Sequence, residues 1–193
     1  MNFEIKDIDL GLIWGKLHNE LVRLDKQIKQ EDDKSELKRN YFITFFCMVE
    51  AMSYSTRQLL LLWNNYKNIE LSSEEIYLLK EKSIEIKYNG AIKTKERYFA
   101  FESLFKFTYL TYSKHFKKES LYKDLISDNR YHSFKEALEI RNRITHPKGS
   151  QSILISQAEF KKICEAHDWY HSFLIEMLKG EFLKEESPKV LTP

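Results

Sequence analysis

The segment "YFITFFCMVEAMSYSTRQLLLLW", residues 41–63, decides the fold class of this chain. It is apolar over about six helical turns, and it is interrupted only by Glu50, Arg57, Gln58 and a few small polar residues. A transmembrane helix needs about 20 largely uninterrupted apolar residues, so these interruptions favour a core helix of a helical bundle. Because nearly every face is apolar, this helix, predicted over about residues 37–66, should be central to the bundle.

The composition supports the same fold class. A chain of 193 residues is long enough for one domain with a full hydrophobic core. Hydrophobic residues make up 42% and charged residues 31%, which excludes a largely disordered chain. Only 5 glycines and 3 prolines occur, whereas a β-rich fold needs many tight turns. The net charge of +2 neither demands nor excludes a polyanionic partner.

The two cysteines and the N-terminus indicate a cytoplasmic protein. Cys47 and Cys164 lie in apolar segments, and two buried thiols fit a reducing compartment better than a disulfide framework. The first residues lack a basic region followed by an apolar region, so no secretory signal is predicted. We expect no membrane association.

Helical spacing of apolar residues continues along most of the chain. It predicts helices over about residues 10–30, 95–117, 133–145 and 156–183, the second of these with an aromatic core face that includes Tyr98. Another helix should begin at "LSSEE", residues 71–75, with Ser72 as N-cap and Glu75 reaching back. The chain should therefore form one all-α domain over residues 1–185, with about five main helices, followed by a flexible tail over residues 186–193.

Residues 83–94 are ambiguous. Ile84, Ile86 and Tyr88 alternate up to Asn89-Gly90, which fits a hairpin with a two-residue turn. Gly90 fits equally well the left-handed residue that ends a helix begun at Ser73. We favour a helix that decays into a short irregular or β excursion.

The segment "EIRNRITHPKG", residues 139–149, gathers polar side chains at one helix end. The spacing of Ile140 and Ile144 turns both toward the core. Asn142 and His146 are i,i+4 and can reach each other. Pro147 biases His146 away from helical geometry, so we expect Arg141 and His146 to flank a shared cleft.

These residue types suit phosphodiester chemistry without a metal ion. Histidine titrates near neutral pH and can transfer a proton, and arginine offers a fork of donors for a phosphate. A helix C-terminus raises the pKa of a histidine, whereas Arg141 and Arg143 nearby would lower it. The plain alternative is an ordinary helix terminus, because cations suit the dipole there and proline is a common stop.

The stretch "RNRITHP" resembles the signature of the HEPN superfamily, in which arginine, a polar residue, three further residues and histidine lie near a helix end. Arg141, Asn142 and His146 match it, followed by Pro147. Such domains commonly carry an acidic or polar residue in an earlier core helix, and Glu50 resembles that position.

Glu50 has two possible environments. In the first, Glu50 pairs with Arg141, which would offset the cost of burying a carboxylate. In the second, Glu50 faces solvent on a polar stripe with Ser53 and Arg57.

The resemblance implies a metal-independent endoribonuclease without cofactors. Its catalytic residues would be Arg141, Asn142, His146 and Glu50, and Arg143, Thr145 and Lys148 would be further phosphate contacts. It implies a homodimer with a composite RNA cleft, products with a 2′,3′-cyclic phosphate or 3′-phosphate and a 5′-hydroxyl, and a role in toxin–antitoxin or anti-phage systems, with an antitoxin or other defence protein as partner. The superfamily also contains inactive members, so the alternative is a non-catalytic module that binds RNA or a protein.

Two further groups of residues, a Cys/His stripe and a basic run, have simpler explanations than a functional site. Cys164, His167 and His171 share one helical stripe, but a structural zinc site normally needs four ligands, so a packed stripe is favoured over a metal site. His18 has no obvious partner. "KHFKKES", residues 114–120, is either a solvated helix end or an extension of an RNA surface.

Overall fold

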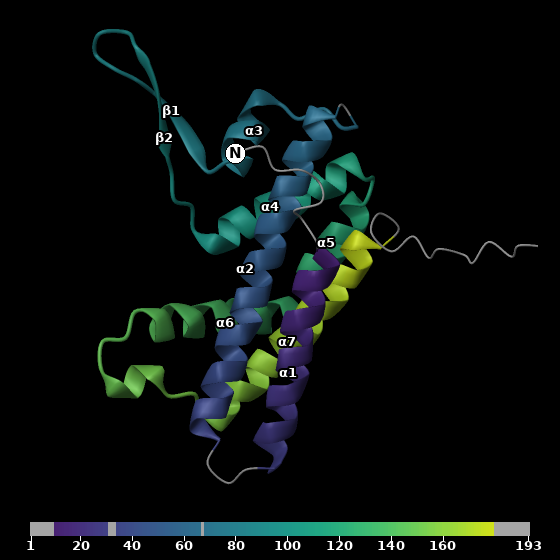
Figure 1. Ribbon diagram of the computed structural model, residues 1–193, viewed down its shortest axis with the longest axis vertical. Coiled ribbons are helices and arrows are strands. Elements are labelled where there is room, and N and C mark those ends of the chain that lie inside the picture. Colours follow the sequence, from purple (N-terminus) through teal and green to yellow (C-terminus); the bar gives the residue numbers. More distant parts are fainter. Residues whose placement is uncertain (1–9, 31–33, 67, 180–193) are drawn as a thin grey trace, which may run out of the picture.

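The computed structural model describes residues 10–30, 34–66 and 68–179, and over these ranges the chain is an all-α bundle with one short β-hairpin (Figure 1). The elements in chain order are α1 Leu10–Gln30, α2 Ser35–Asn65, α3 Ser73–Leu79, β1 Lys82–Ile86, β2 Ile92–Glu96, α4 Phe101–His115, α5 Glu119–Ser127, α6 Asn129–Thr145, the 3-10 helix η2 Ser150–Ile153 and α7 Gln157–Leu178.

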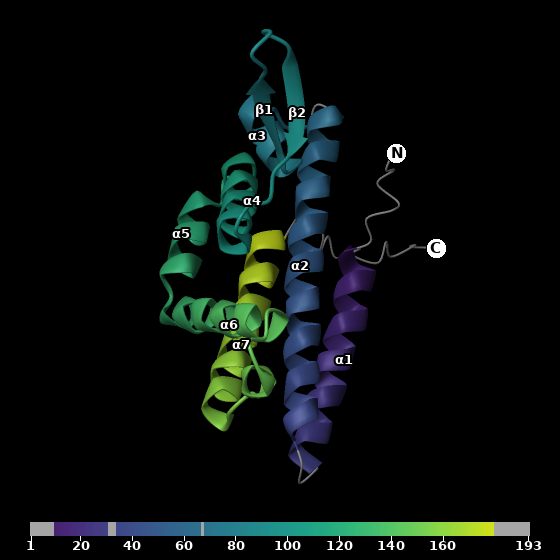
Figure 2. The ribbon, with the colours of Figure 1, turned by 90° about the vertical axis from the view of Figure 1, so that its left-hand side faces the viewer.

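The apolar segment over residues 41–63 lies in α2, which is the central helix. α1 lies alongside it, and α6 crosses it (Figure 2). Phe45, Met48, Val49 and Leu60 are fully buried. In the described part of the chain, no helix has both the length and the apolar character to cross a membrane.

Aromatic side chains fill the core where α4, α6 and α7 meet. The rings of Phe105, Phe134 and Phe173 are buried and contact one another or Trp169. The Trp169 indole N–H donates to the Leu125 carbonyl at 3.0 Å, which satisfies its one polar group. This hydrogen bond joins α7 to α5.

Two helices begin with capping boxes. Ser72 accepts a hydrogen bond from the Glu75 amide and Glu75 accepts one from the Ser72 amide, as predicted. Ser156 and Glu159 make the same exchange at the start of α7. α7 ends at Leu178, and residues 180–183 of the predicted helix and the tail over 186–193 lie outside the described residues.

The favoured prediction for this segment, a helix from Ser73 that gives way to a short β excursion, is confirmed. α3 ends at Leu79, Glu81 takes a positive φ of 53°, and an antiparallel hairpin follows in which Ile86 pairs with Ile92. β-branched residues at period 2 leave no helical face to bury. Gly90 therefore belongs to a hairpin loop and is not the end of a helix begun at Ser73.

The hairpin loop is longer than the expected two-residue turn. The Gly90 amide donates to the Lys87 carbonyl at 2.8 Å, and the Lys87 amide donates to the Ala91 carbonyl at 2.9 Å. Gly90 has φ +79°, the left-handed conformation that follows the turn in such three-residue loops.

α4 begins at Phe101 rather than near residue 95, because residues 95 and 96 pair in β2. Tyr98, predicted in the core, is consequently exposed, whereas Leu104, Phe105 and Tyr109 are buried as expected. α5, which was not predicted, covers the far end of the core with Tyr122.

The cysteines differ from the expectation of two buried thiols. Cys47 is exposed, and Cys164 is partly buried. Desolvation raises the pKa of the Cys164 thiol to about 11, so this thiol stays protonated at neutral pH.

Candidate functional site

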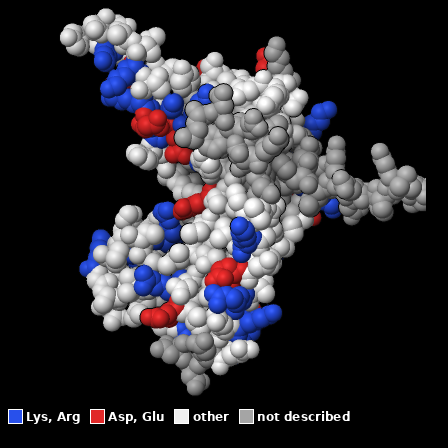
Figure 3. Space-filling view, viewed as in Figure 1, with Lys and Arg blue, Asp and Glu red and all other residues white. Residues whose placement is uncertain are grey.

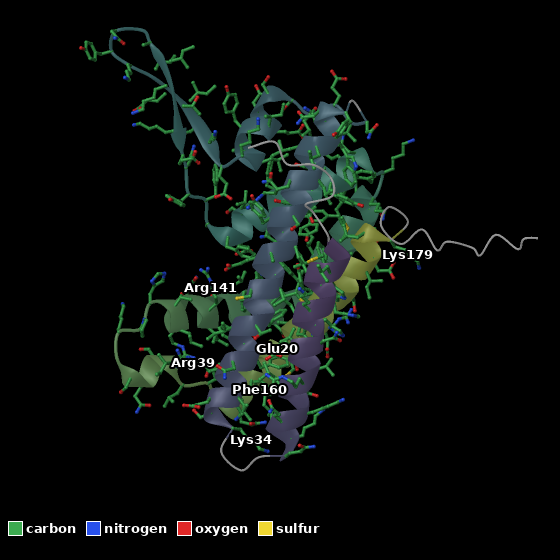
Figure 4. The ribbon with its side chains drawn as sticks, viewed as in Figure 1. Glu20, Lys34, Arg39, Arg141, Phe160 and Lys179 are labelled. Carbon is green, nitrogen blue, oxygen red and sulfur yellow. The ribbon has the colours of Figure 1, made fainter. Side chains whose placement is uncertain are left out.

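An ion pair joins α2 to the motif helix α6. The Arg141 Nη2 donates to Glu50 Oε1 at 2.7 Å where α6 passes α2 (Figure 4). The pairing considered from the sequence is thus confirmed. Glu50 also faces solvent in part, but it does so without the polar stripe of the alternative, because Ser53 and Arg57 are buried and Arg57 pairs with Glu81 at 2.8 Å.

The pair sits at the protein surface rather than in the interior. The Glu50 side chain is 43% exposed and that of Arg141 is 29% exposed. Its net contribution to stability is therefore small, in the range of about 0–1 kcal/mol. Its evident effect is orientation of the guanidinium.

Asn142 adds a second contact to the same guanidinium. Its Oδ1 accepts from Arg141 Nη1 at 3.3 Å. Among the described residues these are the only side-chain partners of Arg141, so further N–H donors of the fork remain available to an anion.

His146 ends the helix. It has φ −126° and ψ 64°, outside helical geometry, and its amide donates to the Asn142 carbonyl at 3.1 Å. This position fits the predicted effect of Pro147 on the preceding residue. The side chain is exposed, and within residues 10–30, 34–66 and 68–179 its imidazole has no hydrogen-bond or ion-pair partner.

A cleft of about 840 Å³ lies between α2, the start of α4, α6 and the base of the hairpin, and the hollow is visible in Figure 3. Glu50, Arg141 and Asn142 line it, and His146 does not. Five carboxylates face three lysine or arginine side chains in its lining. The carboxylates are Glu50, Glu81, Glu102, Glu136 and Glu139, and the cations are Arg57, Lys135 and Arg141.

Arg143 has a structural role that the sequence did not indicate. Its Nη1 donates to the carbonyls of Ser152 at 2.9 Å and Leu154 at 3.0 Å, and its Nη2 pairs with Glu159 at 2.6 Å. The guanidinium thus ties the end of α6 to η2 and to the start of α7. It has few donors left for a phosphate.

The two remaining predicted substrate contacts differ from each other. The Thr145 hydroxyl donates to the Arg141 carbonyl at 2.8 Å, within its own helix. Lys148 is exposed beyond the helix end.

The histidines of α7 belong to a packed cluster with α1. His171 lies 5.2 Å from Trp14 and 5.4 Å from His18 between ring centroids, so His18 has the partners that the sequence did not show. The Tyr41 hydroxyl and His167 Nδ1 are 2.9 Å apart, within hydrogen-bond distance. No group of three or more histidine, cysteine or acidic side chains among the described residues is placed to hold a metal ion.

The basic run 114–120 lies at the solvated end of α4, where Lys114 and Lys117 are exposed, but Lys118 has a further role. The Lys118 ammonium donates to the carbonyls of Met177 at 2.6 Å and Lys179 at 2.7 Å, at the C-terminus of α7. A cation there satisfies unpaired carbonyls and suits the helix dipole.

The sequence did not indicate that Arg57, Glu81 and Tyr98 belong to the cleft lining. One sequence signal could have indicated the role of Arg57, because an arginine among apolar residues needs an acidic or polar partner. Its partner Glu81 lies in the segment that was expected to be helical.

Comparison of the chain with protein-family models, with curated proteins and with solved structures finds no match.

Proposed function

We propose that this protein is an endoribonuclease of HEPN type that cleaves RNA by attack of a 2′-hydroxyl without a metal ion, in a toxin–antitoxin or anti-phage role. The observation that supports it most is the guanidinium of Arg141. It is held by Glu50 and Asn142 at a cleft, on the helix that ends in the exposed His146.

Each residue has a role in this proposal. The 2′-oxygen attacks phosphorus, the 5′-oxygen leaves, and a 2′,3′-cyclic phosphate and a 5′-hydroxyl result. Arg141 stabilises the charge that grows on the phosphate oxygens, while Glu50 and Asn142 orient it. His146 accepts the proton of the 2′-hydroxyl or donates one to the 5′-oxygen, and solvent water takes or supplies the other proton.

A homodimer is part of the proposal. His146 does not line the cleft of its own chain, and two helix ends that face each other would bring an imidazole from one protomer to the guanidinium of the other. Light scattering should then give twice the chain mass of 23.2 kDa. A monomer at the concentration of the cleavage assay would contradict this arrangement.

The test is cleavage of end-labelled RNA in EDTA by the native protein, Arg141→Ala and His146→Ala. The control is Arg130→Ala, which removes an exposed arginine from the other end of the same helix. We expect cleavage with a cyclic-phosphate end by the native protein and the control, and loss in both site variants. Intact tRNA, mRNA and rRNA, or equal cleavage by all variants, would refute the catalytic proposal.

The second candidate is a non-catalytic module that binds RNA or a partner protein in such a system. The position of His146 outside the cleft lining favours it. It predicts salt-sensitive RNA binding, or binding of a partner, that His146→Ala leaves unchanged, with no cleavage by the native protein.

A further inference from the structure

The β1–β2 hairpin projects from the body of the molecule, and lysine and arginine side chains lie along it (Figures 1 and 3). Residues 80–97 contain six lysine or arginine residues and three glutamates, a net charge of +3, whereas the whole chain has +2. The rest of the chain is therefore slightly acidic. Lys80, Lys82, Lys87 and Lys93 form no salt bridge with any residue that the structure describes.

The two faces of the hairpin differ in chemistry. The register pairs Glu85 with Lys93 and Ser83 with Lys95, so these polar side chains share one face. Ile84, Ile86 and Ile92 share the opposite face, and all three are exposed.

Two exposed tyrosines lie at the tip and at the base of the hairpin. Tyr88 in the loop is fully exposed, and Tyr98, just after β2, is 94% exposed. Tyr98 and Glu81 also line the cleft that holds Arg141, so the base of the hairpin forms one wall of that cleft.

The cleft alone is a poor site for a polyanion, because its lining has more carboxylates than cations. A nucleic acid that reaches Arg141 must therefore be attracted by positive charge outside the cleft. The hairpin, whose base lies at the cleft rim, has a net positive charge. Exposed aromatic rings beside cations are the surface on which unpaired bases stack.

We propose that the hairpin is the arm that captures single-stranded RNA and leads it into the Arg141 cleft. The lysines of the hairpin contact phosphates, and Tyr98 stacks against a base at the cleft rim. The destination of the strand, the Arg141 cleft, rests on the proposed function, but capture of RNA by the hairpin does not require catalysis.

The test measures fluorescence anisotropy of a labelled 20-nucleotide single-stranded RNA at 50 and 200 mM KCl. All proteins carry His146→Ala, so that the RNA stays intact. We expect Lys87→Gln/Lys93→Gln to weaken binding about tenfold at the lower salt and to reduce the salt slope by about 1.4, and Tyr98→Ala to weaken binding about fivefold or more.

The matched control is Ile84→Thr/Ile92→Thr, on the opposite face of the same hairpin, which keeps β-branched residues in both strands. We expect its RNA affinity to stay within about twofold of the parent protein. Equal binding by the lysine and tyrosine variants would overturn the inference. So would loss of binding, or a change in molecular mass, confined to the isoleucine variant, because the hairpin would then be a protein-docking surface.

Cleavage assays in the native background separate this inference from the proposed function. If the native protein cleaves and the lysine and tyrosine variants cleave equally well, the inference fails and the proposed function stands. If the hairpin variants lose RNA binding while the native protein never cleaves, the inference stands and the catalytic proposal fails.

Discussion

Arg141 and Arg143 are two residues apart in α6, yet their guanidinium groups meet different partners. Arg141 turns to Glu50 across α2 and keeps donors at the cleft. Arg143 holds two carbonyls and Glu159. The resemblance implied phosphate contacts for both, and the geometry supports that role only for Arg141.

Arg143→Ala should therefore lower stability rather than RNA affinity. It removes three hydrogen bonds that join α6, η2 and α7, and we expect a loss of about 1–2 kcal/mol in the free energy of unfolding. Urea denaturation measures it. Lys148→Ala, an exposed neighbour, is the control and should change stability by less than about 0.5 kcal/mol; an unchanged midpoint for Arg143→Ala would contradict the structural role.

Glu50→Gln should lower RNA cleavage and have little effect on stability. The pair with Arg141 is partly exposed, so the free energy of unfolding should fall by less than about 1 kcal/mol. RNA cleavage should fall at least about tenfold, because the guanidinium loses the carboxylate that orients it. Glu20→Gln, which removes the carboxylate of an exposed pair with Arg23, should leave cleavage unchanged; full activity of Glu50→Gln would exclude an orienting role.

At the scale of elements, the hairpin is the part of the fold that local rules left open. Alternation of apolar residues and an Asn-Gly pair pointed to strands, while the left-handed glycine also fits a helix end. The structure decides for strands, and the loop then depends on Gly90.

Gly90→Ala should destabilise the hairpin by about 1 kcal/mol, because a Cβ is strained at a φ of +79° although no atom lies within 4 Å of it. Hydrogen exchange of the Lys87 amide should accelerate, while amides of α2 exchange as before. Gly15→Ala in α1 is the matched control, with open space and helical geometry. It should stabilise the protein by about 0.5–1 kcal/mol. Equal exchange of the Lys87 amide in both variants would contradict the loop assignment.

At the scale of the whole molecule, the cluster of His18, His167 and His171 joins α1 to α7 and makes the stability of the fold depend on pH. Desolvation first, then His18 and His171, lowers the pKa of His167 to about 4, and Asp25 acts in the opposite direction. Desolvation also lowers the pKa of His171. The packing therefore favours the neutral imidazole at His167 and at His171.

Stability should accordingly fall as the pH falls below about 6.5. The unfolded chain binds a proton at His167 there, whereas the folded protein does so only near pH 4, so protons favour unfolding between these values. From pH 7 to pH 5 this residue should cost about 2 kcal/mol.

Urea denaturation of the native protein and His167→Gln at both pH values measures this contribution. The variant should lose less stability on acidification than the native protein does. His132→Gln changes an exposed histidine and should behave like the native protein. An identical pH dependence for the native protein and His167→Gln would contradict the assignment.

The sequence by itself determined the helical class, the central apolar helix, the capping box at Ser72 and the core-facing spacing of Ile140 and Ile144. These features follow from periodicity and local hydrogen bonding, which nearby residues decide. The sequence also limited the environment of Glu50 to two alternatives, a pair with Arg141 or a polar stripe that faces solvent.

Only the tertiary structure decided between those environments, and only it placed His146 outside the cleft lining, engaged Arg143 with Glu159 and assembled His18 with His167 and His171. Each of these outcomes depends on the angle and register at which distant helices meet. That geometry is set by packing of the whole core rather than by the spacing of residues within one helix.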